Sequence, residues 1–335
     1  MPTDATALFL QSDEVADLAD PAEYVDAVRE GYRQRGEGAP ATPRTTLFSA
    51  EPAGMLTGYL AILPDTGAMG GYTYAAGFSG RDAHFTLPIF DSDSGDPLAV
   101  LDGASMNPHK TGAAGAVGVD ALARRDASDL AVIGSGAQAR GQVRATATVR
   151  DFDRIEVYSP TADHRESFAA EMNDDLDPTV AAVASPAAAI EGADVVITAT
   201  DASEPVFDGD LLEPGTHVTA MGQYHPEKNE LDATTIERAT YVPDLRERVT
   251  QDAGSFINAL DVGVIDEDHV HAELGDIVAG NAPGRQSPDE ITVFDSGGTA
   301  IETVAAGHML YERAKAEGRG EEIDFAPASK ALTGR

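Results

Sequence analysis

The sequence predicts an α/β protein whose larger domain is a doubly wound parallel sheet with helices on both faces. Two observations support this fold class. Short apolar runs alternate with helical segments between residues 129 and 294, which is the order that parallel strands joined by crossover helices require. The first run, residues 130–133, is apolar at every position, as expected of a central strand covered on both faces. With 335 residues, the chain can also form a second domain.

The first third predicts a smaller α+β domain made mainly of antiparallel strands. A helix should run from the Asp20-Pro21 pair, which is a typical helix start, to about Arg35. The segment 91–96 is rich in Asp, Ser and Gly and predicts a hairpin turn. Strands are expected at residues 7–12, 44–48 and 55–62, within 70–88, and at 87–90 and 97–101.

A helix of small residues is expected at the end of the first part of the smaller domain, just before the glycine-turn region. Asn107 can cap it, proline is tolerated at its first position, and the helix should run from Pro108 to about residue 125. Gly112 and Gly115 lie inside it, where glycine costs about 1 kcal/mol relative to alanine. We therefore expect another backbone or a ligand to approach these two glycines closely.

The remaining segments complete the parallel sheet and return the chain to its first domain. Strands are expected at 129–133, 154–158, 180–183, 194–200, 217–221, 240–242 and 291–294, with helices at 163–173, 186–191 and 232–238. An amphipathic helix over residues 300–316 precedes the tail. The predicted domains are residues 1–125 plus about 315–335, and residues 126–314.

A glycine turn follows the first strand of the predicted sheet. Gly134, Gly136 and Ala139 fit the pattern G-x-G-x-x-G/A between an apolar strand and a helix start. The first glycine allows a tight turn, the second lets a pyrophosphate approach the backbone, and the third position must be small for helix–strand packing. The pattern predicts a Rossmann-type dinucleotide site, and the alternative is a glycine turn without a ligand.

The composition excludes several classes of protein. The chain contains neither cysteine nor tryptophan, so no disulfide or thiolate metal site is expected. No apolar run is long enough to span a membrane, and residues 1–4 do not resemble a signal peptide, so we expect a cytoplasmic protein. The net charge of −34, with only four lysines, argues against binding to nucleic acid or anionic membranes. It resembles the acidic surfaces of proteins from salt-accumulating halophiles.

The chain resembles the ornithine cyclodeaminase/μ-crystallin family over nearly its whole length. The resemblance implies a homodimer, a nicotinamide cofactor, no metal, and a substrate-binding and dimerisation domain that is split around the Rossmann domain. Family members include ornithine cyclodeaminase, an archaeal type of alanine dehydrogenase, ketimine and opine-type reductases, and a hormone-binding crystallin. The matching pieces are residues 43–44, 102–116 with Lys-Thr-Gly-Ala-Ala, 134–139, 193–200, 222–231, 273–277 and 294–298.

The resemblance also implies the residues that bind the substrate. Arg44 matches an arginine that holds the substrate carboxylate, a task that suits a planar guanidinium. Lys110 stands where the family usually has arginine, and a buried lysine can also transfer a proton. The family's other substrate lysine is missing, so Tyr72 or Tyr74 is expected to occupy its place.

The loop after the fifth strand departs from the ornithine cyclodeaminases. They carry an aspartate where this chain has Gln223 or Tyr224. Tyr224 and His225 are the candidate acids or bases, and His225 can equally be an ordinary loop histidine. Gly222 and Lys228 are expected near the cofactor.

The choice between NAD and NADP stays open. NAD-binding sheets usually place an acid at the end of the second strand, but residues 158–161 are Tyr-Ser-Pro-Thr. Asp163 favours NAD and Arg165 favours NADP. The remaining candidate cofactor contacts are Ala137, Gln138, Ser159, Thr161, Thr200 and Ser296. His269 and His271 lie in an acidic loop, which we interpret as solvated rather than as a metal site.

The function expected from these residues is an NAD(P)-dependent oxidoreductase acting on a small amino, imino or keto acid. Its chemistry should be alanine dehydrogenase-like or ketimine reductase-like, with hydride transfer at the α-carbon. One alternative is ornithine cyclodeaminase, which forms proline and ammonia from ornithine and uses NAD catalytically. The other is a family member that binds its cofactor or ligand without catalysis.

Overall fold

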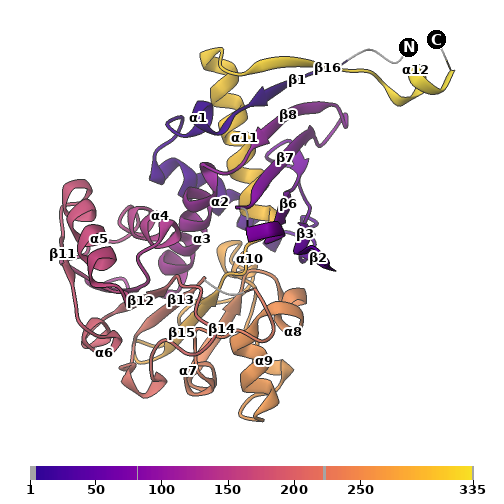
Figure 1. Cartoon of the computed structure of the whole chain (residues 1–335). Coiled ribbons are helices and arrows are strands. Elements are labelled where there is room, and N and C mark those ends of the chain that lie inside the picture. The colour runs from indigo at the N-terminus through magenta and orange to yellow at the C-terminus, as the bar shows by residue number, and fades with distance from the viewer. Residues whose placement is uncertain (1–4, 81, 222–223, 334–335) are drawn as a thin grey trace. The chain divides into compact units, whose positions relative to one another are not determined.

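The computed structural model describes residues 5–80, 82–221 and 224–333. The chain forms two compact units, Met1–Asn107 with Thr299–Arg335, and Pro108–Gly298 (Figure 1). Both boundaries therefore lie nearer the N-terminus than the expected residues 126 and 314. The small-residue helix α3 (Met106–Leu122) belongs mostly to the second unit, and α11 (Ala300–Glu317) belongs to the first.

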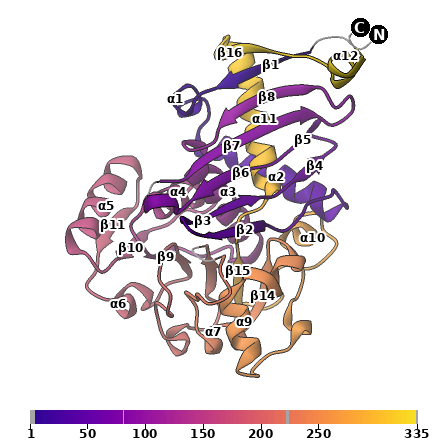
Figure 2. The same ribbon diagram turned by 45° about the vertical axis from the view of Figure 1, so that its right-hand side comes forward.

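The first unit is a nine-stranded, mainly antiparallel sheet in the order β16-β1-β8-β7-β6-β3-β2, with β4 and β5 joined through β7. Helices α2 (Pro21–Gly36) and α11 pack together, and Gly31 lets them approach because its Cβ would lie 3.2 Å from Ala305. Figure 2 shows α11 crossing the sheet. The strands are β1 (Ala5–Leu10), β2 (Thr45–Ala50), β3 (Ala53–Gly58), β4 (Ala61–Leu63), β5 (Ala68–Gly70), β6 (Thr73–Ala76), β7 (His84–Asp91), β8 (Pro97–Asp102) and β16 (Glu321–Phe325).

Two features of this unit test the sequence-based expectations. The tail does return to the first domain, because β16 pairs antiparallel with β1. The single strand expected at residues 55–62 is wrong, since β3 and β4 are separate. The break between the two strands lies against Gly71. A Cβ on Gly71 would be only 1.9 Å from the Tyr59 carbonyl oxygen, so the two backbone segments are in close contact there. α1 (Ser12–Val15) and α12 (Ala328–Thr333) were not predicted.

The second unit is the predicted doubly wound sheet. Its seven strands are all parallel in the order β11-β10-β9-β12-β13-β15-β14, so the order reverses beside β9, where such sheets bind ligands. The strands are β9 (Asp129–Ile133), β10 (Arg154–Tyr158), β11 (Thr179–Ala182), β12 (Val195–Thr198), β13 (His217–Ala220), β14 (Ala239–Pro243) and β15 (Ile291–Asp295). The helices besides α3 are α4 (Ala137–Thr146), α5 (Ala162–Asp175), α6 (Pro186–Ile190), α7 (Ala233–Arg238), α8 (Val249–Asp252), α9 (Gly254–Asp261) and α10 (Leu274–Val278).

The close approach expected at Gly112 and Gly115 is made by helix α4. A Cβ on Gly112 would lie 2.2 Å from the carbonyl oxygen of Gly141, and a Cβ on Gly115 would lie 1.9 Å from the Gln142 side chain. The glycines therefore serve helix packing in the second unit. Helix α3 begins at Met106 rather than Pro108 and ends at Leu122. Pro108 fits in its first turn because backbone N–H groups there have no partner within the helix.

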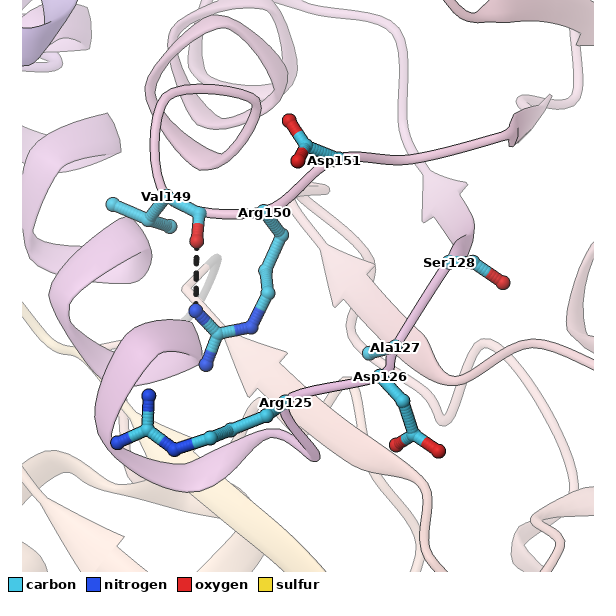
Figure 3. Close-up of a pocket in the computed structure, with 7 residues that line it drawn as sticks. All are labelled: Arg125, Asp126, Ala127, Ser128, Val149, Arg150 and Asp151. Atoms are coloured by element: carbon cyan, nitrogen blue, oxygen red, sulfur yellow. Dashed lines mark hydrogen bonds between the residues drawn. The ribbon is translucent and has the colours of Figure 1, made fainter.

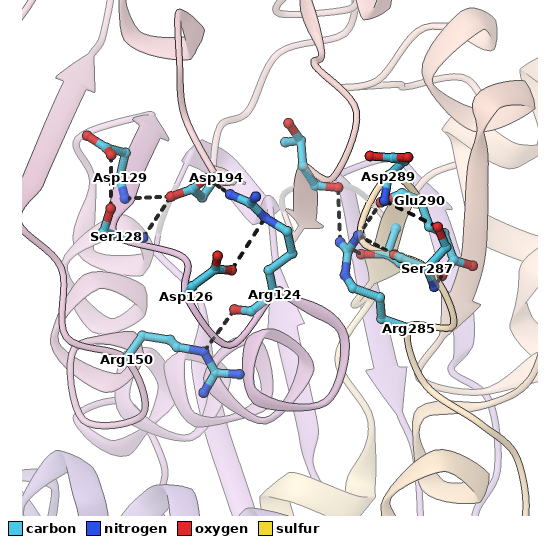
Figure 4. A network of polar contacts seen from close by, with 12 residues as sticks. Arg124, Asp126, Ser128, Asp129, Arg150, Asp194, Arg285, Ser287, Asp289 and Glu290 are labelled. Carbon is cyan, nitrogen blue, oxygen red and sulfur yellow. Dashed lines mark hydrogen bonds and ion pairs between the residues drawn. The ribbon is translucent and has the colours of Figure 1, made fainter.

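A polar network holds the amino ends of the strands in this unit (Figure 4). Arg124 forms an ion pair with Asp194, which precedes β12 and also accepts hydrogen bonds from the backbone N–H groups of Ser128 (2.7 Å) and Asp129 (3.1 Å). Arg285 donates to the carbonyl of Leu122 at 2.8 Å. These contacts fix the edge opposite to the glycine turn.

No helix in the described ranges is long and apolar enough to cross a membrane.

His217 on β13 predicts a loss of stability at acidic pH. Its ring is fully buried between the hydroxyls of Thr292 (2.9 Å) and Thr219 (3.0 Å), and burial lowers its pKa to about 3, with a smaller effect from Arg285. A histidine in the unfolded chain has a pKa near 6.5. The buried neutral ring therefore contributes fully to the free energy of unfolding above that pH, and this contribution is lost as the pH falls towards 3.

Lowering the pH from 7 to 5 should therefore cost about 2 kcal/mol through this group alone. The measurement is the free energy of unfolding of the natural chain and of His217→Gln at both pH values. The variant, which cannot titrate at this position, should lose less stability on acidification. Equal losses in the two proteins would contradict the prediction.

Candidate nucleotide-binding site

The glycine turn lies at the carboxyl end of β9, and its first glycine is required by the backbone. Gly134 has φ +120°, a conformation that side chains disfavour. A Cβ there would also lie 2.3 Å from the carbonyl oxygen of Ala199. The Gly134 N–H donates to the Tyr158 carbonyl at 2.8 Å. The turn is therefore hydrogen-bonded to the end of the neighbouring strand β10, and it packs closely against the backbone just after β12.

The second glycine of the motif is not required by the fold. Gly136 is the N-cap of α4, with φ −80° and ψ −174°, which any residue can adopt, and its Cβ would meet no atom within 4 Å. No side chain caps α4, so its first N–H groups are left for a ligand. The open space beside Gly136 fits a pyrophosphate lying against the backbone.

The other motif residues divide between packing and polar roles. Ala139 is fully buried, as its close-packing position requires, and Ala137 is exposed. Within the described part of the chain, the buried Oε1 atom of Gln138 has no hydrogen-bond partner. An unsatisfied buried acceptor is costly, and a donor on a bound ligand would satisfy it.

The end of β10 is joined to this turn by side-chain hydroxyls. Ser135 in the turn donates to the Ser159 hydroxyl at 2.9 Å, and Ser159 donates to the carbonyl of Thr161 at 3.3 Å. Arg165 donates to the carbonyl of Ser159 at 2.9 Å. These hydrogen bonds hold the connection from β10 to α5 beside the glycine turn.

Glu230 is a site residue that was not predicted from the sequence. It is fully buried, and it accepts hydrogen bonds from the hydroxyl of Thr198 (3.0 Å), the backbone N–H of Thr200 (2.7 Å) and the hydroxyl of Thr200 (2.5 Å). Strand β12 ends at Thr198, so Thr200 lies just beyond it rather than at its end. Glu230 also lines a cavity of about 10 Å³ beside Asp295, which is the size of one water molecule.

Ser296 follows β15 at the same edge of the sheet. Its N–H donates to the Ala220 carbonyl at 2.9 Å, and its side chain is 2% exposed. Among the described residues, the Ser296 hydroxyl has no hydrogen-bond partner. Together with Gln138, it gives the carboxyl edge two buried polar atoms that have no hydrogen-bond partner among the described residues, which fits a bound polar cofactor.

A buried ion cluster centred on Arg248 supports the loop that carries Ser296. The Arg248 guanidinium lies 2.6 Å from Asp244 and 2.8 Å from Asp252, and it also pairs with Asp295. Burial alone would lower the pKa of Arg248, but the three carboxylates raise it well above its usual value. Gly297 lies close to the guanidinium, where a Cβ would be 2.5 Å from Cζ. This cluster was also missed in the sequence, although Asp244, Arg248 and Asp252 have the i, i+4 spacing of helical ion pairs.

The loop after β13 is described only from Tyr224, so the predicted contact of Gly222, and Gln223 beside it, lie outside the described residues. Tyr224 is 41% exposed. The His225 ring nitrogen Nδ1 accepts the N–H of Glu227 at 3.2 Å. The loop backbone at Lys228 packs on the start of α9, because a Cβ on Gly254 would lie 1.8 Å from the Lys228 carbonyl oxygen. The loop is therefore held by its backbone, while Tyr224 reaches solvent.

Two predicted substrate residues lie in one aromatic cluster of the first unit. The Arg44 guanidinium lies 5.3 Å from the centre of the Tyr59 ring, and Tyr59 contacts Tyr72 edge-on. The Tyr72 hydroxyl donates to the Gly103 carbonyl at 2.9 Å, and burial raises its pKa well above the usual value. Tyr72 therefore supports the fold through its hydrogen bond and stays protonated. Arg44 lies one residue before the start of β2.

Lys110 lies in the second unit as the fifth residue of α3, two positions further from the helix start than a helix beginning at Pro108 would place it. Its side chain is 2% exposed. Buried lysines are rare because burying an ammonium group is costly unless it is compensated. Burial therefore makes Lys110 a candidate for a functional role.

Two other features do not belong to the site. A hollow of about 230 Å³ lies between residues 125–128 and 149–151 (Figure 3), at the amino ends of β9 and β10, and its lining includes two arginines and two aspartates. Doubly wound sheets bind ligands at the opposite, carboxyl edge. His269 and His271 donate to the backbone carbonyls of Ile236 (2.7 Å) and Pro283 (2.9 Å), so both rings support loop structure.

Comparison with known proteins agrees with this geometry. The profile of the ornithine cyclodeaminase/mu-crystallin family matches residues 5–318. A Delta(1)-pyrroline-2-carboxylate reductase of Bacillus cereus is 35% identical over 238 residues, which is 71% of this chain and 73% of that protein. The Thermococcus litoralis Delta(1)-pyrroline-2-carboxylate reductase, solved with NADH and L-proline, matches with a TM-score of 0.89 and 32% identity over 94% of this chain and 100% of that chain. An archaeal alanine dehydrogenase dimer with bound NAD matches with a TM-score of 0.89 and 31% identity over 96% and 100%. The chain belongs to the ornithine cyclodeaminase/mu-crystallin family.

Proposed function

We propose that this protein is an NAD(P)-dependent oxidoreductase that acts at the α-carbon of a small amino, imino or keto acid. The observation that carries the proposal is Gly136, a glycine that the fold does not need and that faces open space at the start of α4. Its place at the carboxyl end of β9 fits a nicotinamide dinucleotide. The relatives with pyrroline-2-carboxylate reductase and alanine dehydrogenase names support the substrate class.

The nicotinamide ring, when bound, supplies or accepts the hydride. The chain supplies binding, orientation and proton transfer. Arg44 and Lys110 are the proposed ligands of the substrate carboxylate, as the family resemblance implies. Tyr224 and His225 remain the candidate proton donors, because the loop lacks the aspartate of the ornithine cyclodeaminases. Ser296 offers its unused hydroxyl to the cofactor.

The experiment is a substrate screen that follows the absorbance of the reduced nicotinamide. Pyrroline-2-carboxylate and other cyclic imines, pyruvate with ammonia, and ornithine are each mixed with the protein and NADH or NADPH. Oxidation of the cofactor with an imine or a keto acid supports the proposal. Proline and ammonia formed from ornithine without net cofactor change would instead identify a cyclodeaminase. Cofactor binding without turnover of any substrate would identify a binding protein.

Lys110 can be tested in the same assay. Lys110→Met keeps the length and apolar stem of the side chain but removes the charge, so kcat/KM should fall by roughly a hundred-fold if a charge-assisted hydrogen bond to substrate is lost. Cofactor affinity should not change. Lys315→Met is the matched control. Lys315 lies beside Tyr311 on α11, which belongs to the first unit and carries none of the proposed site residues. Unchanged turnover in Lys110→Met would remove the proposed role.

We also propose that the protein is a homodimer. Leu47 (65% exposed) and Phe48 (74% exposed) lie on the edge strand β2, and the exposed Leu56 on β3 pairs with Leu47. An exposed apolar edge is a liability unless another surface covers it, and the related archaeal alanine dehydrogenase is a dimer. Light scattering at assay concentrations should give twice the mass of one chain, and the mass of a single chain would refute the proposal.

The acidic surface is proposed to be an adaptation to high salt. With 57 acidic and 23 basic residues, mutual repulsion should destabilise the fold at low ionic strength and be screened at molar salt. The melting temperature should rise between dilute buffer and molar KCl. Sucrose, which carries no charge, is the control for effects of excluded solutes. A melting temperature that is unchanged or lower in KCl would contradict this adaptation.

A further inference from the structure

We infer that the chain prefers NADP(H) to NAD(H), an inference that rests on the proposed function. The groups that decide between the two cofactors meet the ribose of the adenosine, at the end of the strand next to the glycine turn. In this structure that position is the connection from β10 to α5. Hydrogen bonds from Gly134 to Tyr158 and from Ser135 to Ser159 join it to the turn.

The carboxylate that recognises an unmodified ribose is absent from the end of β10. The position just after the strand is taken by Ser159, whose side chain is largely buried and whose hydroxyl faces Ser135. Glu156, the nearest acid on the strand, pairs with Arg154 at 3.3 Å. Asp163 is exposed in the first turn of α5. A 2′-phosphate would therefore meet a neutral serine after the strand rather than a like charge.

Arg165 supplies the positive charge that a 2′-phosphate needs. One of its terminal nitrogens donates to the carbonyl of Ser159 at 2.9 Å, and the guanidinium lies 5.9 Å from the centre of the Tyr158 ring. These contacts fold the arginine back over the connection instead of leaving it extended in solvent. In the described ranges its contacts are to backbone carbonyls and to this ring, and none is an ion pair.

An arginine without an acidic partner is informative in this chain. Acidic residues outnumber lysine and arginine by 57 to 23, and the neighbouring arginines are paired: Arg140 with Glu171, and Arg154 with Asp129 and Glu156. A guanidinium held at the ribose position with donors to spare suits bidentate binding of a phosphate. The exposed Thr161, at the N-cap of α5, adds a hydroxyl to the same place.

The test is calorimetric and does not depend on turnover. Adenosine 2′,5′-bisphosphate and 5′-AMP, which differ only in the 2′-phosphate, are titrated into the full chain at one fixed salt concentration. The bisphosphate should bind roughly ten- to hundred-fold more tightly, the range expected for one or two charge-assisted hydrogen bonds. Arg165→Ala should bring the two dissociation constants together. Arg154→Ala changes an arginine at the start of β10, the end of the strand away from the connection to α5. It should leave the ratio of the two dissociation constants unchanged.

Other outcomes separate this inference from the proposed function. Equal or tighter binding of 5′-AMP by the natural chain, or an unchanged ratio in Arg165→Ala, would overturn the preference for NADP(H). The proposed function would survive in that case, provided that NADH binds. If neither NADH nor NADPH binds in parallel titrations, the proposed function itself fails. Ser159→Asp provides a second check, because a carboxylate at this position should reverse the ratio in favour of 5′-AMP.

Discussion

Replacing Arg248 by methionine is expected to destabilise the second unit by about 3–5 kcal/mol, the typical cost of breaking a buried ion pair by removing one of its members. Asp244 and Asp295 are almost fully buried, and Arg248 is the cation that pairs with both of them and with Asp252. Natural domains are stable by only about 5–15 kcal/mol, so the effect should be visible as a large shift of the unfolding transition.

The control for Arg248→Met is Arg154→Met. Arg154 pairs with Asp129 and Glu156 at a partly exposed position, and such pairs contribute about 0–1 kcal/mol. Asp252→Asn is a milder variant of the cluster, because Asp252 is more exposed than the other two aspartates. Denaturant unfolding should rank the losses as Arg248→Met, then Asp252→Asn, then Arg154→Met. A loss in Arg248→Met no larger than in Arg154→Met would refute the proposed importance of the cluster.

Replacing Gly136 by valine should abolish tight cofactor binding and leave the fold intact. The backbone angles at this position suit any residue, and the added side chain would point into open space. The same side chain would occupy the place of the pyrophosphate and separate it from the N–H groups of α4. Losing these charge-assisted hydrogen bonds costs about 3 kcal/mol, or roughly a hundred-fold in Kd.

The contrasting variant is Gly134→Ala. Gly134 has a left-handed backbone, and its Cβ would collide with the Ala199 carbonyl, so this variant should unfold more easily. The measurements are the melting temperature without ligand and the fluorescence titration with NADPH. Gly136→Val should match the natural chain in the first measurement and fail in the second. Undiminished affinity in Gly136→Val would show that the dinucleotide does not bind at this turn.

The parts of the fold that sequence could predict are those set by local patterns. The parallel strands were recognisable because each is a short apolar run followed by a helical segment, and the glycine turn because single residues fix its backbone. Helices α8 to α10 were missed. They have four, eight and five residues, too short for a periodic apolar face to stand out.

The site residues that were missed depend on contacts between distant parts of the chain. Glu230 reaches Thr200 across 30 residues, and Arg248 reaches Asp295 across 47. Which acid meets which donor is decided when the strand ends come together, and spacing in the sequence does not encode it. The exception is the i, i+4 series around Arg248, which was a readable signal. The missing acid after β10 was also readable, but its meaning required the position of Arg165.

The most direct test of the proposed function follows the hydride itself. NADPH or NADH carrying deuterium in both positions of the reactive carbon of the nicotinamide is incubated with the protein and the substrate that the screen identifies. Mass spectrometry and NMR then locate the label in the product. The account predicts one deuterium on the α-carbon of the amino acid for each cofactor oxidised. An amino acid product without deuterium at that carbon, formed while the cofactor stays reduced, would contradict it.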